Sequence, residues 1–118
     1  MSTLYLPHRY IQFIFYINKA NMQLKLASEF IGSSYTSSIT LQDISDSVYM
    51  TPKYFCRFFH EMTHHSPIDY LNYYRIERAC YLLLTTNQTI TEVAYNTGFN
   101  DLSYFIKIFK KHITSVQC

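Results

Sequence analysis

The chain has 118 residues, which is the size of one domain with a modest hydrophobic core. It contains only 2 Gly and 3 Pro, and 48% of its residues are hydrophobic, which favours a helical globule over a disordered chain or an all-β sandwich. The net charge of +2 does not by itself identify a nucleic-acid-binding protein, although the small excess of Lys and Arg lies after residue 50.

The cysteines and the apolar segments indicate in which cellular compartment the protein is expected. Cys56, Cys80 and Cys118 are an odd number without a CxxC spacing, and this favours reduced thiols over a disulfide framework. The apolar run at residues 10–17 is much shorter than the roughly 20 residues of a membrane-spanning helix. We therefore expect a cytoplasmic protein that does not associate with a membrane.

The first third of the chain predicts two helical segments. Residues 8–20 are apolar on more than one face, as expected of a helix with partners on two sides, and they are a candidate for self-association. A second helical pattern covers residues 22–33 and ends at Gly32. The polar stretch 33–38 is then the only obvious linker. We interpret residues 1–21 as a linker or a remnant helix of an upstream domain.

A near-repeat organises the rest of the chain. Residues 40–59 are similar in sequence to residues 89–109. Each copy has the pattern of a short helix, a tight turn and a second helix. Matching residues are 49 positions apart before the turn and 50 after it, so one extra residue lies in the second turn. The repeat predicts an all-α fold with two helix-turn-helix units, at residues 22–66 and 87–118. Such units read two adjacent stretches of DNA.

Both units begin with the same signal. Thr40 with Asp43 and Thr89 with Glu92 fit a capping box, in which a hydroxyl and an acid three residues later satisfy free amide hydrogens. Two further helices are expected to start at Thr51-Pro52 and Ser66-Pro67, and the last helix is expected to be capped by Asn100 or Asp101.

The two turns are expected to differ. Gly98 fits a left-handed turn residue in the second unit. The matching residue of the first unit is Tyr49, for which this conformation is more costly, so we expect a different geometry in the first turn.

A helix from Pro67 to about Thr85, within the segment 67–86, is expected to connect the units. Nineteen residues at 1.5 Å each give a helix of roughly 28 Å. This length could hold two reading heads near the roughly 34 Å that separates successive major grooves on one face of DNA.

The apolar period separates the inner from the outer face of each predicted recognition helix. The inner residues are Phe55, Phe58, Phe59 and Met62 in the first unit and Phe105, Ile108 and Phe109 in the second. The outer residues are Lys53, Cys56, Arg57 and His60 in the first unit and Ser103, Ile106, Lys107 and Lys110 in the second.

Arg57 is the strongest candidate for base recognition, because a guanidinium can bind O6 and N7 of guanine together. Lys107 holds the matching place in the second unit but is a flexible point charge that discriminates less. Cys56 and Ile106 offer apolar surface to a thymine methyl group, and Lys53 and Ser103 lie near the helix starts. Contacts to phosphate are expected from Tyr54, His60, Tyr104, Lys110 and Lys111.

Residues 22–113 resemble the DNA-binding domain of the AraC/XylS family of bacterial transcription regulators. The resemblance is carried by residues 39–44, 50–59, 66–79, 82–83, 90–94, 98–99 and 103–111. It implies a two-headed module that binds double-stranded DNA and usually activates promoters through RNA polymerase. Carried over by position, the base-facing residues are Lys53, Cys56 and Arg57 in the first unit and Ser103, Tyr104 and Lys107 in the second.

Three departures from the family pattern are visible. His64 stands where Gly is usual, so the exit from the first recognition helix is expected to be strained or rearranged. Ser45 stands where Ala is usual and would bury a hydroxyl that needs a partner. After Lys111 the usual closing helix is replaced by a different sequence, so we expect a truncated second unit that is less stable than the first.

Other functional classes are less well supported. Cys56, His60 and His64 follow a spacing of four, but the outer two are roughly 12 Å apart on a helix, too far to share one zinc ion. No phosphate-binding loop, nucleophile elbow or carboxylate pair indicates an enzyme, and no cofactor is expected. The alternative is a truncated interaction protein that binds or antagonises a full-length regulator without reading DNA.

Overall fold

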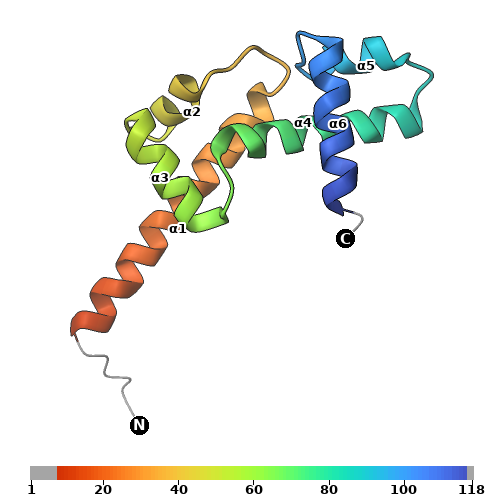
Figure 1. Ribbon diagram of the computed structural model, residues 1–118. Coiled ribbons are helices and arrows are strands. Elements are labelled where there is room, and N and C mark those ends of the chain that lie inside the picture. Colours follow the sequence, from red (N-terminus) through yellow and green to blue (C-terminus); the bar gives the residue numbers. More distant parts are fainter. Residues whose placement is uncertain (1–7, 117–118) are drawn as a thin grey trace.

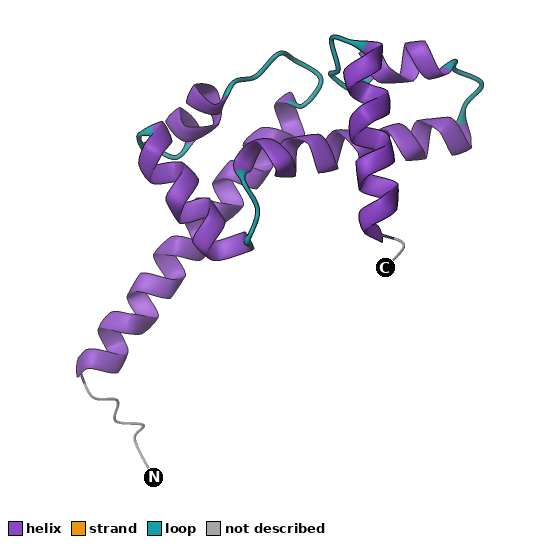
Figure 2. Cartoon of the chain, in the orientation of Figure 1, coloured by secondary structure: helices purple, strands orange, loops and turns teal. Residues whose placement is uncertain are grey.

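The computed structural model describes residues 8–116, and all regular structure in that range is helical. Figures 1 and 2 show two compact groups of helices joined by one long helix. The helices are α1 (His8–Ser34), α2 (Leu41–Ser47), α3 (Pro52–Thr63), α4 (Pro67–Thr85), α5 (Ile90–Asn96) and α6 (Leu102–Val116). The all-α fold with two helix-turn-helix units and a central helix is confirmed.

The first helix differs from its prediction, because α1 is one continuous helix of 27 residues rather than two segments. No Gly or Pro lies between residues 20 and 22 to interrupt it. The inner half packs on the domain through Ala20, Ala27 and Ile31, whereas the first turns extend away from the body of the molecule (Figure 1). The boundary predicted after residue 21 therefore falls inside a helix. Within residues 8–116, no helix has the length and hydropathy needed to cross a membrane.

Each unit has its own hydrophobic cluster. In the first unit, Phe55 and Phe59 of α3 are fully buried against α1 and α2, and Phe58 is 7% exposed. In the second unit, Phe105 of α6 is buried against α5 and α4, while Ile108 and Phe109 are half-buried. The inner faces predicted from the apolar period are confirmed, with Met62 only half-buried.

The connecting helix α4 contributes to both clusters. Leu71 belongs to the cluster of the first unit, whereas Ile76 and Ala79 belong to that of the second. The predicted spacer is confirmed at Pro67–Thr85. The helix α4 also forms one side of both hydrophobic clusters, so both its packing and its length position the units.

The capping interactions of α2 and α5 are both formed as predicted. The hydroxyl of Thr40 accepts a hydrogen bond from the Asp43 amide (3.2 Å), and the Asp43 carboxylate accepts one from the Thr40 amide (2.8 Å). Thr89 and Glu92 form the same pair at 3.1 and 3.0 Å. These reciprocal bonds define where the first helix of each unit begins.

The recognition helices also have polar caps. The Thr51 hydroxyl accepts from the Tyr54 amide (3.3 Å) at the start of α3. Of the two candidates for α6, Asp101 forms the cap, because its carboxylate accepts from the Ser103 amide at 2.9 Å.

The second turn is one residue longer, as the repeat spacing predicts, but the expectation that Tyr49 avoids the left-handed conformation is wrong. Tyr49 adopts the left-handed conformation (φ 59°), as does Gly98 (φ 97°). The amide of Tyr49 donates to the Asp46 carbonyl at 3.1 Å, and that of Gly98 donates to the Tyr95 carbonyl at 3.2 Å. The Tyr49 side chain is 96% exposed, so nothing clashes with it, and the flanking helices impose the conformation.

The first two departures from the family pattern have clear structural counterparts. His64 ends α3 with φ 63°, a helix-ending position where Gly is preferred, and its amide donates to the His60 carbonyl at 2.8 Å. Ser45 is fully buried, and its hydroxyl donates to the Gln42 carbonyl at 3.0 Å. The expected strain is therefore present at His64, and the buried hydroxyl has its partner.

Candidate nucleic-acid interface

The exposed face of α3 carries the residues predicted for the first reading head. Lys53, Arg57 and His60 are exposed, and Cys56 is half-buried beside them. Proline at the first position and the Thr51 cap order the helix start, where free amide hydrogens favour anions. The arrangement presents one guanidinium, one ammonium and one imidazole around a small apolar thiol.

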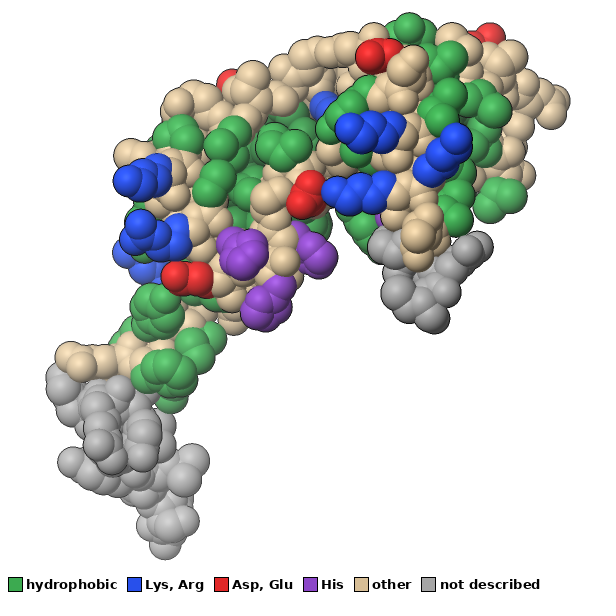
Figure 3. All heavy atoms as spheres, viewed as in Figure 1, with side chains coloured by type: hydrophobic (Ala, Val, Ile, Leu, Met, Phe, Trp, Pro, Cys, Tyr) green, Lys and Arg blue, Asp and Glu red, His purple; other side chains and the backbone are tan. Residues whose placement is uncertain are grey.

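The second reading head has the same layout on α6. Ser103 and Lys107 are exposed on the first two turns, and Lys110 and Lys111 are exposed further along. Ile106 is 39% exposed beside Lys107, in the place that Cys56 takes in the first unit. Figure 3 shows Lys and Arg side chains over both α3 and α6 on one face of the molecule. Both predicted heads are therefore accessible from the same side.

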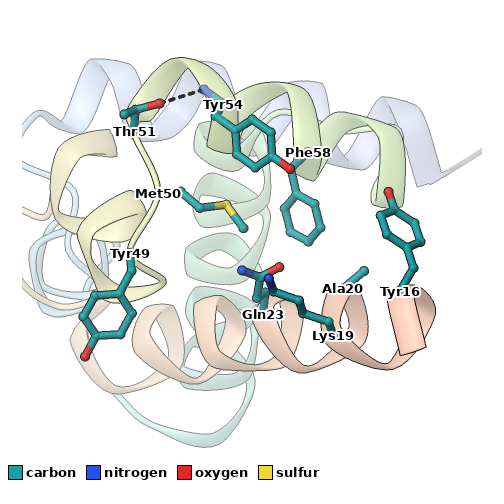
Figure 4. A pocket seen from close by; sticks show the side chains of 9 residues that line it. All are labelled: Tyr16, Lys19, Ala20, Gln23, Tyr49, Met50, Thr51, Tyr54 and Phe58. Atoms are coloured by element: carbon teal, nitrogen blue, oxygen red, sulfur yellow. Dashed lines mark hydrogen bonds between the residues drawn. The ribbon is translucent and has the colours of Figure 1, made fainter. Parts of the chain in front are cut away.

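A groove of about 510 Å³ extends the surface beside α3 onto α1 (Figure 4). Tyr54, predicted as a phosphate contact, is 56% exposed and lines it together with Lys19 and Gln23 of α1. The remaining lining residues are Tyr16, Ala20, Tyr49, Met50, Thr51 and Phe58. Lys19 was not a candidate from sequence, because only the fold brings α1 beside the start of α3.

Tyr104 has a structural partner in addition to its predicted role. Its hydroxyl accepts a hydrogen bond from the Asn72 side-chain amide of α4 at 2.8 Å, and its ring lies 6.2 Å from that of Phe99. The side chain is still 41% exposed, and the hydroxyl keeps its own hydrogen for donation. Tyr104 thus links the start of α6 to the central helix.

Sequence reasoning missed Arg75, which is only 8% exposed in the middle of α4. Its guanidinium donates to the carbonyls of Tyr35 and Ser37, both at 2.8 Å. Burial lowers the pKa of Arg75, and the nearby Tyr104 partly opposes this. A signal was available, since Arg75 lies four residues from both Leu71 and Ala79 on the apolar stripe of the helix.

A second groove of about 420 Å³ lies between α4 and α6. His112 borders it, with one ring nitrogen 2.9 Å from the Glu77 carboxylate and its ring 4.6 Å from that of Tyr73. The charge of Glu77 is the main cause of a raised pKa at Tyr73. The other lining residues are His65, Asp69, Tyr70, Asn72, Ile108 and Lys111. Sequence reasoning singled out neither this groove nor the contact between His112 and Glu77.

The structure does not assemble the metal site that was weighed from the spacing of Cys56, His60 and His64. Among the residues described, no three side chains of His, Cys, Asp or Glu are grouped so that they could hold an ion. His64 lies beyond the last turn of α3 in a left-handed conformation, which takes it off the helical register.

Known proteins are similar to this chain in sequence and in fold. The profile of a helix-turn-helix domain family matches residues 44–115. The HTH-type transcriptional regulator YdeC of Bacillus subtilis is 35% identical over 89 residues, which cover 75% of this chain and 31% of that protein. The chain spans about a third of the length of the curated relatives that it matches.

Two solved structures have the same architecture. The C-terminal domain of the response regulator yesN from Fusobacterium nucleatum has a TM-score of 0.69 and 37% identity, and the match covers 75% of this chain and 92% of that one. The DNA-binding domain of AdpA, solved with a target DNA, has a TM-score of 0.71 at 21% identity, covers 77% and 81% of the two chains, and supports the fold alone. With its two capped helix-turn-helix units, this chain belongs to the AraC/XylS family of helix-turn-helix transcription regulators.

Proposed function

We propose that this chain binds double-stranded DNA sequence-specifically and regulates transcription, with α3 and α6 entering adjacent major grooves. The observation that carries the proposal is the repetition of one reading head. Arg57 and Lys107 occupy the same place in the two units, both are exposed, and both lie on capped helices accessible from one side. An ordinary solvated helix surface does not require this recurrence.

The residue roles follow from reach and chemistry. Arg57 reads a guanine through two hydrogen bonds, and Lys107 makes the weaker matching contact. Lys53, Cys56, Ser103 and Tyr104 complete the base-facing set, and Tyr54, His60, Lys110 and Lys111 hold phosphates and set the register on the duplex.

Two partners extend the proposal. Activation through RNA polymerase is expected from the family and would use a surface that DNA leaves free. Self-association through residues 8–20 is supported by the projecting half of α1, where Phe13, Phe15 and Tyr16 are each about 60–70% exposed. Apolar side chains at this exposure favour contact with another surface.

A DNA-binding titration at several salt concentrations tests the proposal. The logarithm of the binding constant falls with the logarithm of the salt concentration, by about 0.9 in slope for each phosphate that the protein neutralises. Two reading heads should therefore give a steep decrease. Arg57→Ala and Lys107→Ala should each weaken binding to a sequence selected from random DNA. Lys25→Ala is the matched control, since Lys25 is exposed on α1 outside both recognition helices. No binding at low salt would reject the proposal.

The second candidate is an interaction protein that binds or antagonises a full-length regulator without reading DNA. The exposed apolar residues of α1 favour it. It predicts oligomers in solution, no binding of DNA at low salt, and no effect of Arg57→Ala on any measured association. The same titration, combined with sedimentation analysis, separates the two candidates.

A further inference from the structure

Arg75 joins the central helix to a loop of the first unit. Its Nε donates to the Tyr35 carbonyl and its Nη2 donates to the Ser37 carbonyl, both at 2.8 Å. Both carbonyls belong to the loop between α1 and α2, which the sequence marks only as a polar linker. The rigid fork of a guanidinium suits two acceptors at once, so Arg75 holds this loop in one position.

The same guanidinium also contacts the second unit. It lies over the ring of Phe99, 5.8 Å from the ring centre. Phe99 is 2% exposed and belongs to the cluster of the second unit. A buried cation over an aromatic face is attracted to it. One side chain of α4 therefore contacts a loop of the first unit and a core residue of the second.

The turn of the second unit closes against the same loop. A Cβ atom on Gly98 would lie 2.1 Å from the Tyr35 carbonyl oxygen and 2.7 Å from Nε of Arg75, so only glycine fits there. The Asn100 side chain donates to the Ser38 hydroxyl at 3.2 Å. We call the loop 35–38, Arg75 and the turn 98–100 the interunit joint.

Other contacts described for α6 hold it on the central helix, through the pair of His112 with Glu77 at 2.9 Å and the ring contact of His112 with Tyr73. The hydrophobic clusters of the two units share no residue among those described, and α4 is the element that contributes to both. Long helices curve gently rather than staying straight, so contacts beside α4 contribute to the angle between the units. The interunit joint adds polar contacts to the side of this helix, and the bond from Asn72 to Tyr104 adds another at the start of α6.

We propose that Arg75 is a positioning residue that fixes the orientation of α6 relative to α3, and thereby determines which spacing of two DNA segments the chain reads with full affinity. This rests on the proposed function, since it concerns how the two reading heads act together. When two heads are held in register, the second contact forms within the complex at a high effective concentration. Loosening the joint reduces this advantage and leaves the contacts of each head unchanged.

Arg75→Lys tests the proposal because it keeps the charge and removes the fork. Lys25→Arg is the control: it exchanges the two basic side chains at an exposed position of α1, outside the interunit joint and outside both recognition helices. Two DNA duplexes are compared, one with the full site selected by the unaltered chain and one in which the half read by α6 is randomised. Circular dichroism verifies that each variant keeps its helical content.

We expect Arg75→Lys to weaken binding to the full site by about tenfold or more and to leave binding to the half-randomised site within about twofold. Lys25→Arg should leave both within about twofold. An equal loss on both duplexes, or no loss on either, would overturn the proposal. If Arg75→Lys reduces helical content, Asn100→Ala replaces it with changes expected in the same direction, because it removes the bond to the Ser38 hydroxyl on the exposed side of the joint.

A distance measurement without DNA separates failure of this inference from failure of the proposed function. Spin labels are attached at Glu61→Cys on α3 and Lys110→Cys on α6, both exposed positions, in a chain whose own cysteines are replaced by serine. The unaltered joint should give a narrow distance distribution, and Arg75→Lys should broaden or shift it. An unchanged distribution would refute the positioning role, even if the chain binds DNA; absence of DNA binding would refute only the proposed function.

Discussion

Tyr49 and Gly98 occupy the same turn position in the two units and share a left-handed backbone, although only one of them is glycine. The amide after each of them donates to a carbonyl five residues earlier, from Met50 to Ser45 and from Phe99 to Ala94, both at 3.0 Å. The turn geometry is thus imposed by the helices on either side. A tyrosine at this position carries a conformational cost of about 1–2 kcal/mol that a glycine does not.

Tyr49→Gly should raise the free energy of unfolding by about 0.5–1 kcal/mol, because relief of the left-handed strain exceeds the greater flexibility of glycine in the unfolded chain. The side chain is 96% exposed, so few contacts are lost. Urea denaturation monitored by circular dichroism measures the change. His64→Gly is a useful comparison and should gain less, since histidine tolerates this conformation better. A lower stability of Tyr49→Gly would contradict the explanation.

The two units should differ in local stability. Within residues 8–116, the buried cluster of the first unit contains nine residues and that of the second contains six. A smaller apolar core lowers the free energy of local opening. We therefore expect backbone amides of α5 and α6 to exchange with deuterium faster than those of α2 and α3, as measured by hydrogen-exchange mass spectrometry or NMR. Equal protection of both units would show that the joint and α4 make the domain one cooperative unit.

Arg57→Lys should separate base reading from general attraction to DNA. The charge is kept, so the affinity for random DNA and its salt dependence should change little. The bidentate contact is lost, so discrimination at one base pair should fall by about 1–3 kcal/mol. Competition binding with single-base variants of the selected site measures this. Lys107→Arg is the reciprocal variant, and loss of discrimination at several separated bases after Arg57→Lys would point to a positional role instead.

Cys80 should react slowly with alkylating reagents. Burial, with a smaller effect of Glu77, raises the pKa of the Cys80 thiol. The thiolate is the reactive form, so a raised pKa leaves less of it at any pH below the folded pKa. Iodoacetamide labelling followed by mass spectrometry should show slower modification in the folded chain than in urea, and the difference should narrow as the pH rises. Equal rates at pH 8 in the two states would contradict the raised pKa.

Local signals in the sequence determined the helices and their starts. The capping pairs Thr40–Asp43 and Thr89–Glu92 act over three residues, and the inner phenylalanines of α3 follow the 3.6-residue period. The near-repeat extended this local information to the architecture, because two similar segments adopt similar structures. These features depend on neighbours along the chain, so the sequence alone was sufficient to predict them.

Only the tertiary structure decided how the two units are held together. The hydrogen bonds of the joint connect residues far apart in sequence: Arg75 to Tyr35 over 40 residues, and Asn100 to Ser38 over 62. The conformation of Tyr49 likewise results from the packing of the flanking helices, which overrides local preference. A polar side chain in a helical pattern reads as a solvent-facing residue until the fold supplies its partners. The position of Arg75 on the apolar stripe of α4 indicated that it is buried, but only the fold identified the carbonyls of Tyr35 and Ser37 as its partners.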